Sequence, residues 1–286
     1  MTIAGVIGNC DGWDEIEDFC YSKEKWLREH MRLELEHGIP SETTFARVWK
    51  QIDPEAFKRC FTQWTKHVHE KLTGEIISID GKTVRGSKSE ERRPIHMISA
   101  WATEQELVLG QMCVEEKTNE IPTVPLLLEL LDISGCIVTA DAMSCQREIT
   151  KKIIDGKGDY VLSLKENQPT LYEYAETYFK DALEHPQWYP EMTSCETVDK
   201  GHGRIEKRTY YLSSDLSGLD NAADWSGLAG FGMVRSHVTV GEVESSEIRY
   251  AITSLKSVQQ FAHAWRKHWG IENGLHYCLD VSFNED

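Results

Sequence analysis

The first 70 residues place hydrophobic side chains at helical spacing. Trp13, Ile16 and Phe19 recur every three residues, which is typical of one face of an amphipathic helix. A Gly-Ile-Pro sequence at 38–40 interrupts this pattern before further helical segments begin. The pattern predicts a helical region over residues 1–70. Two of its helices, joined by a tight turn, form either a helix-turn-helix or a plain helical hairpin.

From residue 75 the pattern changes to short apolar runs that alternate with helical segments. We predict strands at 75–80, 95–103, 106–114, 136–141 and 160–164, and helices at 121–131, at 144–154 and after Pro169. Residues 190–255 return to alternating patterns at 204–213, 233–240 and 247–253, which indicate a β-rich antiparallel insertion before a closing helical region from Ser257. Hairpin strands followed by strand–helix units predict an α/β fold with a mixed sheet flanked by helices.

Two of the predicted strands end in an acid, Asp80 and Asp141. In open α/β sheets, functional sites gather at the carboxyl ends of strands, so these acids would meet if their strands were neighbours. A third acid, Glu272, lies on the closing helix, where His268, Glu272, His276 and Asp280 recur every four residues. Paired carboxylates suit Mg²⁺-dependent phosphodiester cleavage. By pattern alone, an acid after a strand is more often a turn or capping residue.

A zinc site is the alternative for the closing helix, because His268, Glu272 and His276 are spaced four residues apart. The spacing lacks the H-E-x-x-H arrangement, and carboxylate chemistry explains Glu272 without zinc. The eight cysteines contain no C-x-x-C pair, so we expect reduced thiols rather than a zinc ribbon.

The charge distribution bears on DNA as a partner. The formal net charge of −16 argues against DNA binding, which usually depends on Lys and Arg. The acid is concentrated locally: residues 172–200 carry seven Asp or Glu against two Lys. Residues 82–93 carry five Lys or Arg against two Glu, and residues 200–208 carry four against one. A local basic face on an acidic protein is therefore compatible with DNA.

No apolar run approaches the roughly 18 residues that a membrane span needs. The first residues lack a basic segment followed by an apolar stretch, so no secretory signal is predicted. We expect a cytoplasmic protein with no membrane partner.

Several motifs resemble the insertion-sequence transposases of the H-repeat-associated protein family. They are EHGIPSETTFARVWKQIDPEAF, ISIDGKTVRGS, IVTADAMSCQREI, GDYVLSLKENQPTL, GHGRIEKRTYY and HWGIENGLHYCLDVSFNED, in that order along nearly the whole chain. The resemblance implies a DDE transposase with a ribonuclease H-like catalytic domain over residues 71–286. It also implies two Mg²⁺ or Mn²⁺ ions, DNA partners (element ends and target), and a homodimer or larger assembly on DNA.

By position, the resemblance assigns catalysis and metal binding to Asp80, Asp141 and Glu272. The wider DDE group has Tyr, Arg, Glu and Lys at set spacings on the last helix. In this chain Trp265, His268 and Leu279 stand at the Tyr, Arg and Lys places. His268 remains a candidate phosphate contact.

Further candidates for DNA contact are polar or basic. Lys82 and Arg85 follow the first acid in a predicted Gly-flanked loop, where a solvated surface is the alternative. Polar residues before the helix at Pro169 could meet phosphate or simply cap that helix. Basic residues of the β-rich insertion could follow DNA or form a charged strand face. These two groups are Lys165, Asn167 and Gln168, and Arg204, Lys207 and Arg208.

Alternatives to an active transposase remain open. Family members usually begin upstream and continue past the FNED string, so a truncated or inactive copy is one reading. Such a copy could bind element ends without cutting and repress transposition. A metal nuclease that cuts without joining, and an acidic interaction protein unrelated to DNA, are the others.

Overall fold

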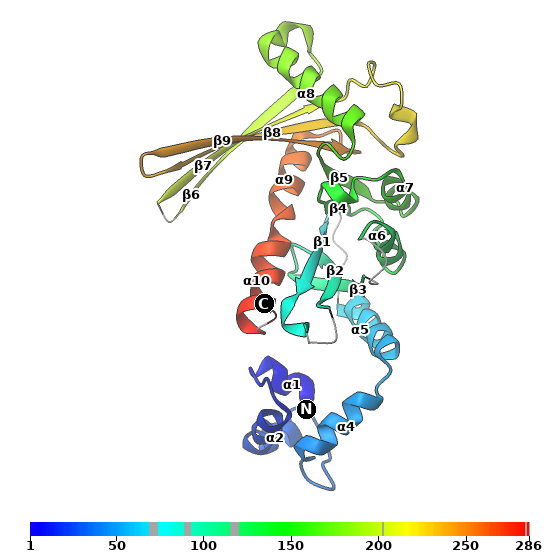
Figure 1. The fold of residues 1–286 in the computed structure, drawn as a ribbon, viewed down its shortest axis with the longest axis vertical. Coiled ribbons are helices and arrows are strands. Elements are labelled where there is room, and N and C mark those ends of the chain that lie inside the picture. The colour runs from blue at the N-terminus through cyan, green and yellow to red at the C-terminus, as the bar shows by residue number, and fades with distance from the viewer. Residues whose placement is uncertain (69–73, 89–92, 115–119, 202, 284, 286) are drawn as a thin grey trace. The chain divides into compact units, whose positions relative to one another are not determined.

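The computed structural model describes residues 1–68, 74–88, 93–114, 120–201, 203–283 and 285. The chain divides into two compact units, Met1–Trp64 with Tyr277–Asp286, and Thr65–His276. Figure 1 shows the elements of both units.

The first unit is helical, as the spacing of its hydrophobic residues predicted. A small core holds Ile16, Cys20, Leu27 and Phe45. Ile16 and Cys20 lie four residues apart on one face of a single helix, and Leu27 and Phe45 come from two other helices, so short helices bury them together. The helices are α1 (Thr2–Ile7), α2 (Trp13–Ser22), α3 (Glu24–Glu29), α4 (Glu42–Gln51), the first part of α5 (Pro54–Val68) and α10 (Tyr277–Ser282).

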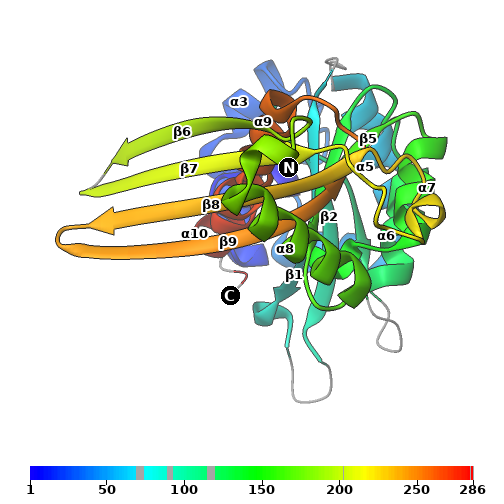
Figure 2. The ribbon, with the colours of Figure 1, turned by 90° about the horizontal axis from the view of Figure 1, so that it is seen from above.

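The second unit is built on one nine-stranded mixed sheet in the order β3-β2-β1-β4-β5-β9-β8-β7-β6 (Figure 2). Strands β1, β4 and β5 are parallel to one another, and every other neighbouring pair is antiparallel. The strands are β1 (Ile76–Val84), β2 (Ile95–Ala102), β3 (Leu107–Cys113), β4 (Ile137–Ala140), β5 (Asp159–Leu164), β6 (Thr193–Gly201), β7 (Arg204–Ser213), β8 (Gly230–Val240) and β9 (Val243–Thr253).

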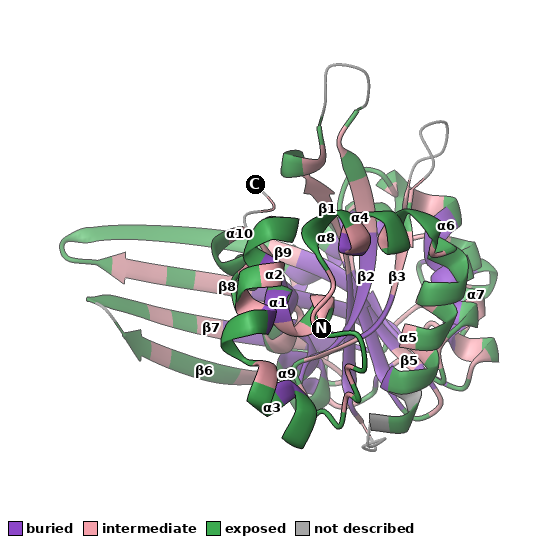
Figure 3. Cartoon of the chain, turned by 90° about the horizontal axis from the view of Figure 1, so that it is seen from below, coloured by how far each residue is buried: buried purple, intermediate pink, exposed green. Residues whose placement is uncertain are grey.

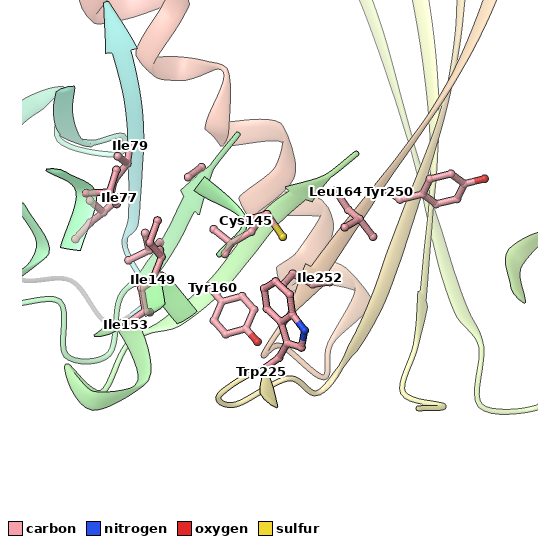
Figure 4. Close-up of a cluster of buried hydrophobic side chains, with 14 of the residues drawn as sticks. Ile77, Ile79, Cys145, Ile149, Ile153, Tyr160, Leu164, Trp225, Tyr250 and Ile252 are labelled. Atoms are coloured by element: carbon pink, nitrogen blue, oxygen red, sulfur yellow. The ribbon is translucent and has the colours of Figure 1, made fainter. Parts of the chain in front are cut away.

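Helices cover both faces of this sheet. Helices α6 (Glu120–Glu129), α7 (Arg147–Asp155) and α8 (Pro169–Glu184) pack on one face, and α9 (Val258–His268) packs on the other. The alternation of side chains along a strand explains the division. In β1, Ile77 and Ile79 belong to the core under α6–α8, whereas Ile76 belongs to the core under α9. Figure 4 shows part of the first core.

The β-rich segment is antiparallel, as its pattern indicated. Strand β9 pairs antiparallel with β5, so β6–β9 extend the central sheet. The sequence pattern missed β6, an edge strand whose residues are mostly exposed. Figure 3 shows buried residues in the central strands and exposed residues along the far ends of β6–β9.

Candidate active site

The register between β1 and β4 brings two acids side by side. Their last parallel pair is Ile79 with Ala140. Asp80 follows Ile79, and Asp141 follows Ala140. The backbone of Asp141 stays extended (φ −72°, ψ 177°), so the strand alternation continues through it. The two strands are neighbours, which is the condition that the sequence analysis set for the two acids to meet.

The structure corrects the prediction that β1 ends at Asp80. The parallel pairing with β4 stops at Ile79, but the antiparallel pairing with β2 continues to Val84. Asp80 therefore lies inside a strand, opposite Ser99. A position in a paired strand fixes the backbone of Asp80 more firmly than a loop would, because the residues before and after it are both paired with β2.

The third acid comes from the far end of α9. This helix ends at His268, and a π-helical turn follows at Ile271–His276. Glu272 lies in that turn and is exposed. The predicted four-residue stripe is therefore wrong as a single regular helix, because the wider turn interrupts the α-helical phase. Such π turns occur often at functional sites.

All three acids line one cavity of about 340 Å³. Its other walls come from the β5–α8 loop, from β9 and from α9, and include Lys165, Arg249, Trp269 and His268. Three positions separated by up to 192 residues in the sequence thus open onto the same space. The structure brings the predicted acids together.

The pKa of Asp80 reflects the closeness of the other acids. The pKa of Asp80 is raised to about 7. Burial is the largest cause, and the carboxylates of Asp141, Glu272 and Glu120 also contribute. The backbone N–H of Gly81 donates to Asp80 Oδ1 at 2.9 Å and opposes this rise. Asp80 therefore lies in a field of like charge that a cation would relieve.

The chemistry of these donors fits a hard divalent cation. Mg²⁺ prefers a few carboxylates together with water and substrate oxygens over a closed protein cage. Three carboxyl groups on one cavity, one with a pKa raised by burial and by the other two, offer that set of ligands. Among the residues that the structure describes, no group of three or more His, Cys, Asp or Glu is already drawn together as a metal cage. The predicted zinc alternative has no preformed cage in the same described ranges.

One histidine contacts the first acid, and a second lies on the neighbouring strand β2. His276 Nδ1 lies 3.6 Å from Asp80 Oδ2. On β2, His96 contacts Thr83 through Nδ1 (2.9 Å) and Glu120 through Nε2 (2.5 Å). The sequence analysis named His276 only as a zinc alternative, and its contact with Asp80 was not predicted. Only the tertiary structure places it there.

His268 also lines the cavity, and its contact with a phosphate stays a prediction. Burial lowers the pKa of His268 to about 4, a nearby Asp141 raises it, and Arg249 lowers it. Its Nδ1 lies 3.0 Å from Thr139 Oγ1. A ring that is neutral near pH 7 brings no positive charge to a phosphate, so charge is not its contribution here.

Lys82 and Arg85 lie on and beyond the far end of β1. Lys82 is inside the strand, opposite Met97, and not in the loop that was predicted. By strand alternation it shares the face of Asp80, two residues before it. Arg85 is exposed and begins a short 3₁₀ turn, Arg85–Ser87. Contact of either residue with DNA stays a prediction.

The polar residues before α8 divide into two kinds. Lys165 lines the cavity and is exposed. Asn167 Nδ2 donates to the carbonyl of Ala142 at 2.6 Å, and Gln168 Nε2 donates to the carbonyl of Cys145 at 2.9 Å. The two amides therefore tie the loop before α8 to the loop that follows Asp141. This arrangement supports a structural role, and DNA contact by either amide stays a prediction.

A groove of about 810 Å³ runs along strands β7–β9 and α9, and the cavity shares part of its wall. It contains Arg204 and Arg208, whereas Lys207 alternates to the other side of β7. Arg208 is only 11% exposed and is held by Asp199 (2.7 Å) and Glu206 (2.5 Å). Arg204 is 55% exposed, so it has much more surface to offer a ligand.

The sequence analysis missed three residues shared by the cavity and the groove, Glu247, Arg249 and Trp269. The guanidinium of Arg249 lies 4.8 Å from the centre of the Trp269 ring. No motif pointed to Arg249. Its place in the site was decided only by the pairing of β9, in which Arg249 lies opposite Val234 of β8.

Comparison with known families identifies the class of this protein. Residues 71–286 match the family described as Transposase DDE domain, and residues 1–65 match the family described as DDE_Tnp_1-associated. The chain belongs to the DDE transposase family. This agrees with the resemblance drawn from its motifs.

Individual relatives narrow the comparison. The chain is 41% identical over its whole length to YncI of Escherichia coli O157:H7, whose name marks it as a transposase, and covers 74% of it. It is 39% identical to the H repeat-associated YhhI of Escherichia coli strain K12, covering 100% of this chain and 76% of the relative. A protein of Xanthobacter autotrophicus is 37% identical, with 89% of this chain and 85% of the relative covered.

Among solved structures, a piggyBac transposase synaptic complex with hairpin DNA aligns with a TM-score of 0.41 and 10% identity. The alignment covers 88% of this chain and 53% of that one. In the part of the chain that the structure describes, no helix is both long and apolar enough to span a bilayer.

Proposed function

We propose that this chain is a DNA transposase that cuts DNA at the ends of an insertion sequence and joins the freed end to a target. The observation that carries the proposal is the convergence of Asp80, Asp141 and Glu272 on one cavity. Family membership and relatives named as transposases point the same way.

The central strands support a ribonuclease H-like core for this domain. The order β3-β2-β1-β4-β5 has an antiparallel hairpin on one side of β1 and two parallel strands on the other. In this arrangement the first and fourth strands run side by side, so their carboxyl ends present acids at one edge. The third acid then arrives from a helix on one face of the sheet.

Asp80 and Asp141 are the residues that would hold both divalent cations, and Glu272 would complete one of the two sites. When bound, such cations lower the pKa of a water and stabilise the leaving oxygen of a phosphodiester. The chain's own part is to orient the carboxyl groups. The N–H of Gly81 holds Asp80 Oδ1 at 2.9 Å, and the N–H of Met143 holds Asp141 Oδ1 at 3.1 Å.

The groove beside the cavity supports DNA as the partner. Four arginines line it, and the wall that it shares with the cavity contains Arg249 and Trp269. Arginine suits phosphate, and an indole offers a face for a base. A strand lying in this groove would reach the carboxylates directly. The groove has four arginines against two glutamates, Glu206 and Glu247, and this local excess of arginine supports DNA binding despite a formal net charge of −16.

We expect the acting species to be at least a dimer on paired element ends, because joining two ends to one target needs two catalytic sites. The purified protein should cleave its own element ends and join them to plasmid DNA in Mg²⁺. Asp80→Asn, Asp141→Asn and Glu272→Gln should each lower the rate on the order of 1000-fold, since several kcal/mol of charge stabilisation is lost.

Different outcomes separate the alternatives. Salt-sensitive binding to element ends without cleavage would indicate a repressor. Cleavage without joined products would indicate a nuclease. A wild-type protein that cuts no faster than Asp80→Asn would overturn catalysis by these acids.

A further inference from the structure

A chain of buried hydroxyl groups lies beneath the two aspartates. Thr139 Oγ1 donates to Ser78 Oγ at 3.1 Å, and Ser78 Oγ lies 3.2 Å from Thr103 Oγ1. Ser78 and Thr139 are register partners across β1 and β4, two residues before Asp80 and Asp141. All three hydroxyl side chains are buried. The face of the sheet under α9 thus changes from apolar residues to hydroxyl groups and then to carboxylates.

His268, the last residue of α9, contacts the end of this row of hydroxyl groups. Its Nδ1 lies 3.0 Å from Thr139 Oγ1. A threonine hydroxyl has one hydrogen, and that hydrogen is directed to Ser78. The oxygen of Thr139 can therefore only accept from the ring, so Nδ1 of His268 carries the proton. This reasoning selects one of the two neutral tautomers.

The other ring nitrogen then has a free lone pair. Burial holds the pKa of His268 near 4, so the ring stays neutral at physiological pH. Within the described parts of the chain, the contact with Thr139 is the hydrogen bond that His268 makes. The same side chain lines the cavity that holds the three acids. Nε2 is thus an unprotonated acceptor belonging to a residue of the catalytic cavity.

We propose that His268 orients the attacking hydroxyl, either water or a DNA 3′-hydroxyl, by accepting its hydrogen bond at Nε2. This inference rests on the proposed function and deepens it, because it assigns a nucleophile-positioning residue to the same cavity. The O–H bond stays intact in this contact. What the ring supplies is direction, since a hydroxyl whose hydrogen is bound to Nε2 turns its lone pairs away from the ring.

The row of hydroxyl groups fixes the tautomer and the orientation of the His268 ring. A histidine that orients another group usually has its second nitrogen fixed by a partner, which sets both tautomer and ring angle. Here that partner is anchored to the strand that carries Asp141, and through Ser78 to the strand that carries Asp80. The same pair of strands, β1 and β4, therefore positions both Nε2 of His268 and the two aspartates.

Nitrogen NMR of the imidazole tests the tautomer without any DNA or metal. With ¹⁵N-labelled histidine in the full chain at pH 7, His268 should show a protonated Nδ1 and an unprotonated Nε2. Thr139→Ser should keep this pattern, because serine retains the hydroxyl, and Thr139→Val should shift the ring toward the other tautomer. An Nε2-protonated ring, or an imidazolium, in the wild type would overturn the proposal.

Two amide substitutions test the role in catalysis. His268→Gln places an amide near Nε2, and His268→Asn places one near Nδ1. If the ring orients the nucleophile, Asn should lower kcat on the order of 100-fold while KM for DNA changes little, and Gln should restore part of the rate. If the ring only anchors α9 to the sheet, Asn should retain activity and Gln should lose it, which would overturn the inference.

His263→Asn provides the matched control, because His263 is an exposed histidine on the same helix, 3.1 Å from Glu104. It should retain wild-type rates. Thermal unfolding of each variant separates loss of folding from loss of rate. A wild type that neither cuts nor joins DNA would refute the proposed function, whereas the NMR result would still decide the tautomer. Active wild type with unaffected His268→Asn would refute only the inference.

Discussion

His276 Nδ1 lies 3.6 Å from Oδ2 of Asp80, so a ring from the π-helical turn faces a carboxyl group in the middle of β1. The other oxygen, Oδ1, accepts from the N–H of Gly81. The carboxyl group of Asp80 is thus positioned from two directions before any ligand is present. This is the arrangement by which neighbouring residues prepare a carboxylate for a cation.

His276→Ala should therefore weaken metal binding more than it weakens folding. The Mg²⁺ concentration for half-maximal cleavage should rise on the order of 10-fold, because removal of a residue that orients a ligand typically has that effect. Titration of cleavage rate against Mg²⁺ measures it. His185→Ala, at a half-buried histidine just after α8, is the control and should titrate like wild type. Identical titrations for His276→Ala would contradict the role given to this ring.

Asp80 should make the free energy of unfolding depend on pH in the absence of metal. Its pKa is raised from 3.8 to about 7 by burial and neighbouring carboxylates. Between these values the folded protein binds more protons than the unfolded chain. The stability should therefore fall as the pH rises from about 4 to about 7, and stay level above that.

Asp80→Asn should remove this dependence and stabilise the protein at pH 8 by roughly 1–4 kcal/mol. Urea unfolding in EDTA across pH 4–8 measures the change. Glu173→Gln, an exposed acid on α8, should follow the wild-type curve. If the wild type instead gains stability between pH 4 and pH 7 relative to Asp80→Asn, the raised pKa is wrong.

The amides of Asn167 and Gln168 should matter for stability more than for DNA affinity. Each donates to a carbonyl in the loop after Asp141. Gln168→Leu should cost about 1–2 kcal/mol of stability, because it leaves a partly buried carbonyl without its donor. DNA affinity, measured at several salt concentrations, should keep its wild-type slope. A slope reduced by about one would instead indicate a lost phosphate contact.

Arg204 and Arg208 should behave differently although both line the groove. Arg204→Ala should reduce the salt dependence of DNA binding by about one charge and leave unfolding nearly unchanged. Arg208→Ala should destabilise the protein by about 2–4 kcal/mol, because it removes the cation that sits between Asp199 and Glu206. Chemical unfolding and fluorescence anisotropy on element-end DNA measure the two quantities. Equal effects of both substitutions on both quantities would contradict this division.

Much of the catalytic domain follows from local pattern. The strands at 95–102 and 107–113, the helix at 120–129 and the strand at 137–140 lie where hydrophobic periodicity placed them, within one or two residues. The reason is that buried strands and amphipathic helices each need a characteristic spacing or run of hydrophobic residues, which is visible in the sequence. The acids were found by the same route, with the family motifs as a second signal.

The errors concern segments whose partners decide their conformation. β6 was missed because an edge strand with exposed residues on both faces has no strong apolar alternation. Lys82 was placed in a loop, because nothing local to β1 shows that β2 continues to pair as far as Val84. The stripe from His268 to Asp280 assumed one regular helix, and the π turn at Ile271–His276 interrupts it.

By itself, the sequence determined the order and type of the elements, the two acids that follow apolar strand residues, and membership in the transposase family. Only the tertiary structure decided that Ser78 and Thr139 are register partners, that His268 meets the second of them, and that His276 reaches Asp80. Periodicity reports which face of an element is buried, because burial depends on local composition. It carries no information about register between strands 60 residues apart, which the packing of the whole sheet selects.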